Sequence, residues 1–198
     1  YRSLGIDKGK KNILFVDGSF QSVNALTSPL DDIQIALEEF IDSARKLPDL
    51  NFIVKFHPNL GSPKTEGFDA IQKRVNLIER SNLNNLHIAP LNSKPQVYIN
   101  DCYLAVHQYS TMGIEFMLKE KCAIIINLTG KKGIWNIKDN IETSMIVEKN
   151  GDLFSYIDDL TKNESSFINH LNIQEKLINE LLFTNVETYG KSLSKILI

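Results

Sequence analysis

Short apolar runs alternate along the chain with longer segments in which apolar residues recur at helical spacing. Each run ends at glycine, proline or a polar residue, as the buried strands of a parallel sheet do. The most apolar of them, CAIIIN, begins at Cys122. The pattern predicts six strands. They are expected at residues 12–17, 51–56, 86–89, 102–106, 122–127 and 144–147.

The first helical segment carries clear start and stop signals. Ser28 can cap the helix, Pro29 suits its first position, and Asp31 suits the positive end of its dipole. Apolar residues then recur at helical spacing up to Leu47, and Pro48 ends the pattern. Similar patterns predict the other helices. One of them begins within residues 64–66, and the others cover residues 94–100, 111–120, 151–160 and 173–183. The tail to residue 198 is a further helical candidate.

Alternating strands and helices predict an α/β fold: a doubly wound, Rossmann-like parallel sheet of about six strands with helices on both faces. The chain has 198 residues, within the range of about 100–200 that one domain usually has. We therefore expect residues 1–198 to form a single domain. In such a sheet, ligands bind beyond the carboxyl ends of the strands, where the winding direction changes. The strand exits are thus the places to search for a site.

Composition and charge exclude several classes of protein. Apolar residues make up 42% and charged residues 23% of the chain, which argues for a folded core and against disorder. The net charge of −2 gives no sign of a nucleic-acid partner, which would need a concentrated basic surface. No apolar run is long enough to cross a membrane, and no signal peptide is evident. Because the chain begins with Tyr1, we expect it to be a piece of a longer protein.

The two cysteines, Cys102 and Cys122, are too few for a disulfide framework. Both are expected near the starts of buried strands, as free thiols in a reducing cytosol. The four histidines are scattered without the spacing of a zinc site, and the sequence contains no G-x-S-x-G motif. Metal-dependent hydrolysis and serine-nucleophile chemistry therefore have no motif to support them.

The first two strand exits carry candidate ligand-binding residues. After the first strand, Gly18 and Ser19 could let a phosphate approach the backbone, or they form a plain turn. That loop lacks both the G-x-G-x-x-G and the P-loop motif. After the second strand, His57 could donate a hydrogen bond to a phosphate, with Pro58 fixing its direction. A purely structural role for His57 stays open.

The exit of the fourth strand is the richest in polar groups. Ser110 or Thr111 can cap the following helix, whose N-terminus is a natural anion site. Gly113 allows close approach of a ligand or of the neighbouring strand. Glu115 lies one turn into the helix, where it could bind two ribose hydroxyls or simply face solvent. The fifth exit carries Lys131 and Lys132, which could contact a phosphate or form a solvated loop. Trp135, beyond them, could stack on a sugar or base or be buried against the final helix.

Taken together, the order of strands, the His57-Pro58 element and the run from Tyr109 to Leu118 resemble the C-terminal, donor-binding half of GT-B-fold glycosyltransferases. The bacterial enzymes of capsule, lipopolysaccharide and teichoic-acid synthesis are the most similar members. The resemblance covers roughly residues 11–160. UDP-N-acetylglucosamine 2-epimerases share this architecture and a similar serine-rich turn.

The resemblance implies roles for individual residues. Ser110 and Thr111, with Tyr109, Met112 and Gly113 in the same turn, would hold the donor diphosphate, and Glu115 would bind the nucleotide ribose. His57 would lie beside the phosphates or the transferred group, which makes it the candidate catalytic residue. Gly18 and Ser19 would face the donor. The nucleotide-sugar-binding set is thus Gly18, Ser19, His57, Tyr109, Ser110, Thr111, Met112, Gly113 and Glu115.

The sequence also departs from the family. Many retaining members carry two glutamates separated by seven residues, and here the upstream position is His107, which argues against that mechanism. No Asp-x-Asp element is present, so we expect no metal and no cofactor besides the nucleotide-sugar substrate. The resemblance implies an N-terminal acceptor domain outside this chain, without which we expect weak donor binding and no transfer. It also implies a cytoplasmic enzyme, with peripheral association at the inner face of the membrane as an option.

Two other functions stay open from the sequence. A nucleotide-sugar 2-epimerase would use the same donor site and need no acceptor. A non-catalytic nucleotide-binding or interaction module would need no partner domain. The sequence specifies neither the base, nor the sugar, nor the acceptor.

Overall fold

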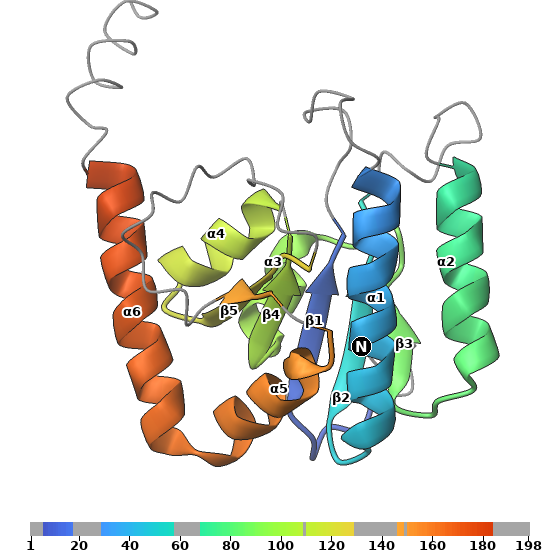
Figure 1. Ribbon diagram of the computed structural model, residues 1–198, viewed down its shortest axis with the longest axis horizontal. Coiled ribbons are helices and arrows are strands. Elements are labelled where there is room, and N and C mark those ends of the chain that lie inside the picture. The colour runs from blue at the N-terminus through green and yellow to red at the C-terminus, as the bar shows by residue number, and fades with distance from the viewer. Residues whose placement is uncertain are drawn as a thin grey trace, which may run out of the picture.

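In the computed structural model, six strands form one parallel sheet in the order β3-β2-β1-β4-β5-β6 (Figure 1). The structure describes residues 6–17, 29–57, 68–108, 110–128, 146–148 and 150–183. This architecture confirms the predicted fold class. The strands are β1 (Asn12–Val16), β2 (Asn51–Lys55), β3 (Leu86–Ile88), β4 (Leu104–His107), β5 (Cys122–Ile126) and β6 (Ile146–Val147). The helices are α1 (Pro29–Lys46), α2 (Phe68–Ser81), α3 (Pro95–Asp101), α4 (Thr111–Leu118), α5 (Asp152–Lys162) and α6 (Glu164–Phe183).

The winding direction changes between β1 and β4. The chain adds β2 and β3 on one side of β1 and then returns to place β4 on the other side. Helices α1, α2 and α5 contribute to the buried cluster on one face of the sheet, and α3, α4 and α6 to the cluster on the other. A sheet wound in this way opens a crevice at the carboxyl ends of β1 and β4.

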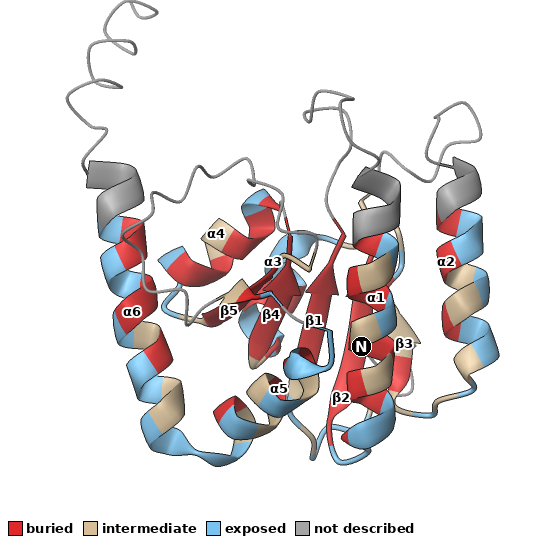
Figure 2. Cartoon of the chain, in the orientation of Figure 1, coloured by how far each residue is buried: buried red, intermediate tan, exposed pale blue. Residues whose placement is uncertain are grey.

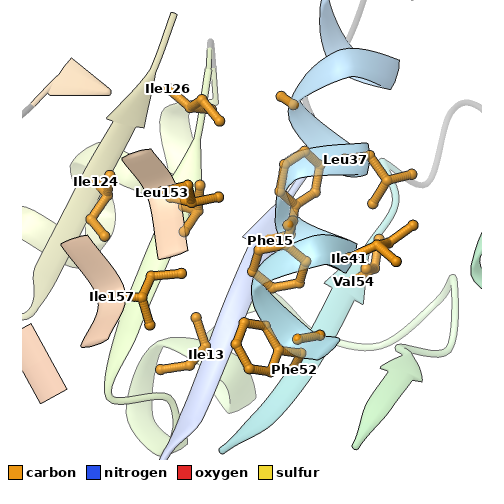
Figure 3. Close-up of a cluster of buried hydrophobic side chains, with 14 of the residues drawn as sticks. Ile13, Phe15, Leu37, Ile41, Phe52, Val54, Ile124, Ile126, Leu153 and Ile157 are labelled. Atoms are coloured by element: carbon orange, nitrogen blue, oxygen red, sulfur yellow. The ribbon is translucent and has the colours of Figure 1, made fainter. Parts of the chain in front are cut away.

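Both faces of the sheet are buried, because alternate residues of each strand pack into opposite clusters. On the first face, Phe15 and Phe52 pack against Phe40 of α1. The ring centroid of Phe40 lies 5.3 Å from that of Phe15 and 5.0 Å from that of Phe52. Figure 3 shows this cluster extending from Leu37 of α1 to Ile157 of α5. In Figure 2 the strands β2, β4 and β5 are buried along their whole length, and the long helices carry one buried stripe and one exposed stripe.

Several predicted boundaries differ by one or two residues from those of the structure, and three differences bear on the core or the site. Helix α6 begins at Glu164, earlier than the apolar pattern indicated. Cys102 does not belong to β4 but follows the last turn of α3, where its N–H donates to the carbonyl of Tyr98. Strand β4 extends to His107, which the pattern placed in a loop. Both cysteines are buried thiols outside any disulfide, and Cys122 begins β5 as expected.

Polar contacts attach the early part of α6 to β5. The amide of Gln174 accepts from the N–H of Ala123 and donates to the carbonyl of Lys121. The Nε2 atom of His170 lies 3.0 Å from the Ala123 carbonyl, and its Nδ1 lies 2.9 Å from the hydroxyl of Tyr156 in α5. These residues are polar, so an apolar pattern could not reveal that this part of the helix is buried.

Candidate functional site

A cleft of about 440 Å³ lies beyond the carboxyl ends of β1, β2 and β3 and beside the N-terminus of α4. Its size is within the range of about 300–1,000 Å³ that is usual for small-molecule sites. It opens at the crevice that the change of winding predicts. Its lining consists of Val16, Asp17, Lys55, Phe56, His57, Leu91, Asn92, Ser93, Lys94, Pro95, Ser110, Thr111, Met112 and Glu115.

One wall of the cleft is the first turn of α4. Ser110 is the N-cap residue, and its hydroxyl accepts a hydrogen bond of 3.2 Å from the N–H of Met112. The N–H of Gly113 donates to the Ser110 carbonyl at 3.0 Å. Thr111 is the first residue of the helix, so its N–H has no acceptor within the helix. This N–H and the helix dipole give the wall a positive partial charge that favours an anion.

The Ser110 side chain therefore stabilises the helix as well as the wall. We expect Ser110→Ala to lower the free energy of unfolding by about 1 kcal/mol, the usual effect of losing a side-chain N-cap. Urea unfolding of the unliganded chain measures this directly. Ser110→Thr, which keeps the hydroxyl, is the matched control, and equal stability of the wild type and Ser110→Ala would contradict the capping role.

Three further residues of the same helix line the cleft with different surroundings. Thr111 is exposed and Glu115 is half-buried, so both are accessible from the cleft. Met112 is buried, and most of its side chain packs in the hydrophobic cluster of α3, α4 and α6. Met112 therefore shapes the cleft mainly through packing, whereas Thr111 and Glu115 offer it polar atoms.

His57 lies on the opposite wall, directly after β2. Burial lowers the pKa of His57, and the positive charge of Lys55 lowers it further. The pKa of the imidazole therefore lies below its ordinary value of 6.5, and the ring is neutral at pH 7. A neutral imidazole can donate one hydrogen bond and accept another.

His107, at the end of β4, has a structural role: its side chain packs against the first turn of α4. The residue is 1% exposed, and burial lowers the pKa of its ring to about 4. The ring lies so close to Gly113 that an added Cβ there would overlap it. Gly113 therefore allows the close approach of the neighbouring strand, which is one of the two roles that the sequence left open. Among the described residues, neither ring nitrogen of His107 has a hydrogen-bond partner.

An ion pair fixes the end of β1 at the floor of the cleft. Asp17 follows β1, and its Oδ2 accepts from Nη1 of Arg74 in α2 at 2.9 Å. Both side chains are almost fully buried, at 0% and 2% exposure. Burial raises the pKa of Asp17 to about 6, with the nearby guanidinium opposing the rise. The sequence analysis missed this pair because Arg74 lies in a helical pattern that places polar residues at the surface.

The structure brings together five of the sequence-predicted site residues in one cleft. Gly18, Ser19 and Tyr109 lie outside the described residues, as do Lys131, Lys132 and Trp135. The sequence analysis missed Lys55, which lines the cleft with His57, although its position two residues before His57, at the end of the strand, was a usable signal. The residues brought together are His57, Ser110, Thr111, Met112 and Glu115.

Other features of the described residues are less suited to ligand chemistry. A second hollow, of about 410 Å³, lies at the outer edge of β3 between Ile78 and Ile88 and away from the change of winding. Within the described ranges, no group of three His, Cys, Asp or Glu side chains is placed to hold a metal ion. None of the helices in those ranges is both long and apolar enough to cross a membrane.

Comparison with known proteins gives similarity in structure but not in sequence. No family model matches the chain, and no curated protein matches it either. Among solved structures, the C-terminal domain of a glycosyl transferase group 1 family protein (LpcC) from Francisella tularensis has a TM-score of 0.57. It is 14% identical, and the match covers 87% of this chain and 87% of that domain.

Two longer proteins have higher TM-scores. HepE (Alr3699) from Anabaena, solved in complex with UDP-glucose, has a TM-score of 0.64 at 12% identity, with 95% of this chain and 50% of HepE covered. The trehalose-6-phosphate synthase OtsA has a TM-score of 0.65 at 12% identity, with 94% of this chain and 44% of OtsA covered. The chain thus spans about half the length of these two proteins. At such identities the similarity shows the fold, which is that of the C-terminal domains of GT-B glycosyltransferases, as the sequence resemblance implied.

Proposed function

We propose that this chain is the donor-binding domain of a glycosyltransferase and that its cleft binds a nucleotide-sugar. The single observation that carries the proposal is the convergence of His57 with the N-terminus of α4 in one cleft at the change of winding. The GT-B fold supports it, and so does the UDP-glucose bound to HepE.

The chemistry of the cleft fits a nucleoside phosphate leaving group. Transfer of a sugar needs stabilisation of the negative charge that develops on the departing phosphate. The Thr111 N–H and hydroxyl supply hydrogen-bond donors, and the dipole of α4 supplies a positive potential. Glu115 lies one turn further along, where a carboxylate can accept hydrogen bonds from two ribose hydroxyls. His57 on the facing wall is the candidate catalytic residue, placed to donate a hydrogen bond to a phosphate or the transferred group.

The finer parts of the proposal concern the whole enzyme. We place it in bacterial surface-polysaccharide synthesis, in the cytoplasm, with peripheral association at the inner face of the membrane. An N-terminal domain would supply the acceptor site. We expect the donor site to work without a metal ion, because hydrogen-bond donors of the cleft would face a bound phosphate and the sequence has no Asp-x-Asp element.

Calorimetric titration of this chain with CMP, CDP, UDP and GDP tests the donor site. We expect saturable binding of one nucleotide. Glu115→Gln should weaken that binding about 10-fold, because a charge-assisted hydrogen bond contributes about 1.5–3 kcal/mol. Glu120→Gln is the matched control: Glu120 follows the same helix but is exposed and does not line the cleft.

Two results would overturn the proposal. One is the absence of binding by every nucleotide up to millimolar concentration. The other is binding that Glu115→Gln and Glu120→Gln change equally, which would place the ligand elsewhere on the fold.

A further inference from the structure

Lys55 is a buried cation in the wall of the cleft, and the function proposed above gives it no role. Lys55 is 4% exposed, yet it lines the cleft. Its ammonium donates to the carbonyl of Leu91 at 2.9 Å and to that of Phe56 at 3.2 Å. An ammonium group has three N–H donors. Among the described residues, these two carbonyls are the acceptors of the ammonium; they fix its position and leave one donor over.

Within the part of the chain that the structure describes, the charge of Lys55 is only partly compensated. Burial lowers its pKa, because neutral carbonyls stabilise an ammonium less than water does. Within the described ranges, no carboxylate forms an ion pair with it. The other titratable groups lining the cleft besides His57 are Asp17, Lys94 and Glu115. Of these, Asp17 is bound to Arg74, and no ion pair joins Glu115 to Lys55 within the described ranges, so an anionic ligand is a natural partner for Lys55.

The position of Lys55 suits a phosphate. Lys55 and His57 lie two residues apart at the end of β2, and both line the cleft that the first turn of α4 closes on the other side. An anion between these walls would meet the ammonium, a neutral imidazole and the helix N-terminus. A compact ammonium binds phosphate as a point charge. All three groups therefore favour an anion such as phosphate.

We propose that Lys55 is a phosphate-binding residue of the cleft, with its ammonium placed by the carbonyls of Phe56 and Leu91 so that its third N–H is available to a phosphate oxygen. The inference rests on the proposed donor site and adds a residue that brings a positive charge to it. The ligand group concerned is the phosphate part of a nucleoside phosphate, whatever its base.

Lys55→Met tests the contact, since methionine keeps most of the side-chain length and removes the charge. We expect it to weaken the tightest-binding nucleotide among CMP, CDP, UDP and GDP by about 10- to 100-fold. Binding of the matching nucleoside, which has no phosphate, should change less than 3-fold. Lys121→Met is the matched control, because the Lys121 ammonium also donates to two main-chain carbonyls, those of Asn100 and Cys102, but lies outside the cleft. Equal losses for nucleotide and nucleoside would overturn the proposal.

A second measurement needs no substitution and so does not depend on the variant folding. Lysine side-chain NMR of the wild-type chain follows the pKa of Lys55, and we expect nucleotide or pyrophosphate to raise it. A change in pKa caused by pyrophosphate, with no nucleotide bound, would support Lys55 and contradict the donor function. Nucleotide binding that leaves the Lys55 signal unchanged would contradict the role of Lys55 and keep the donor function. Binding of neither ligand would contradict both.

Discussion

Gly113→Ala is expected to destabilise the chain by about 1–3 kcal/mol, the usual cost of overpacking a buried site. A loss of stability is the opposite of the usual effect, because alanine normally stabilises a helix interior by about 0.5–1 kcal/mol relative to glycine. Here an added Cβ would overlap the ring of His107 on β4. That ring is fully buried, so either it or the first turn of α4 must move. The same displacement should weaken ligand binding at the helix N-terminus.

A double-mutant cycle with His107→Ala isolates the cause. His107→Ala alone leaves a cavity and should destabilise the chain. In its background, Gly113→Ala should cost less than about 0.5 kcal/mol, the range expected of a substitution that meets no obstacle. Urea unfolding of the four proteins measures the cycle. Additive effects would show that the ring of His107 is not what excludes a side chain at position 113.

Arg74→Met is expected to cost about 3–5 kcal/mol at pH 7, because it leaves the carboxylate of Asp17 buried without its partner. The Asp17–Arg74 contact of 2.9 Å joins the end of β1 to α2. Arg45→Met is the matched control: Arg45 pairs with Asp42 on the surface of α1, where both side chains are well exposed. That pair should contribute at most about 1 kcal/mol. Equal effects of the two substitutions in urea unfolding would contradict the account.

The same pair should give the chain a distinctive pH dependence. The pKa of Asp17 is about 6 in the folded chain, against 3.8 for an ordinary aspartate. Between these values the folded chain holds a proton that the unfolded chain has released. The contribution of Asp17 to stability is therefore fully present below about pH 4 and is lost as the pH rises through about 6. At about 1.4 kcal/mol for each pKa unit, the change amounts to roughly 3 kcal/mol.

Urea unfolding between pH 4 and pH 7 measures this dependence. The wild type should lose this contribution as the pH rises, and Asp17→Asn should remove that slope. The cost of Arg74→Met should be smaller at pH 5 than at pH 7, because a protonated Asp17 needs no counter-ion. Identical pH profiles for the wild type and Asp17→Asn would show that Asp17 does not titrate in this range.

The fold could be predicted from the sequence because its strands are short apolar runs and local composition is enough to find them. The predicted element boundaries were wrong where polar residues are buried. Gln174 and His170 hold the early part of α6 on β5 through hydrogen bonds, and a hydrophobic pattern carries no trace of such bonds. His107 ends β4 as a buried imidazole, although its polarity indicated a loop.

The candidate site was predictable in part for a different reason. His57, Ser110 and Glu115 follow strands whose carboxyl ends meet at one edge of the sheet, so topology alone brings them close together. Arg74 and Lys55 depend on contacts between distant segments. Arg74 reaches Asp17 across 57 positions of the chain, and Lys55 reaches the Leu91 carbonyl across 36. Those pairings exist only once the sheet has formed.

The central claim is that the cleft between β2 and α4 is the nucleotide-sugar site. Amide NMR of the chain, titrated with the tightest-binding nucleotide among CMP, CDP, UDP and GDP, tests it most directly. The account predicts saturable shifts concentrated in residues 55–57, 91–95 and 110–115. Shifts centred on the hollow at the edge of β3, around Asn82 and His87, would contradict it, as would the absence of any shift at millimolar nucleotide.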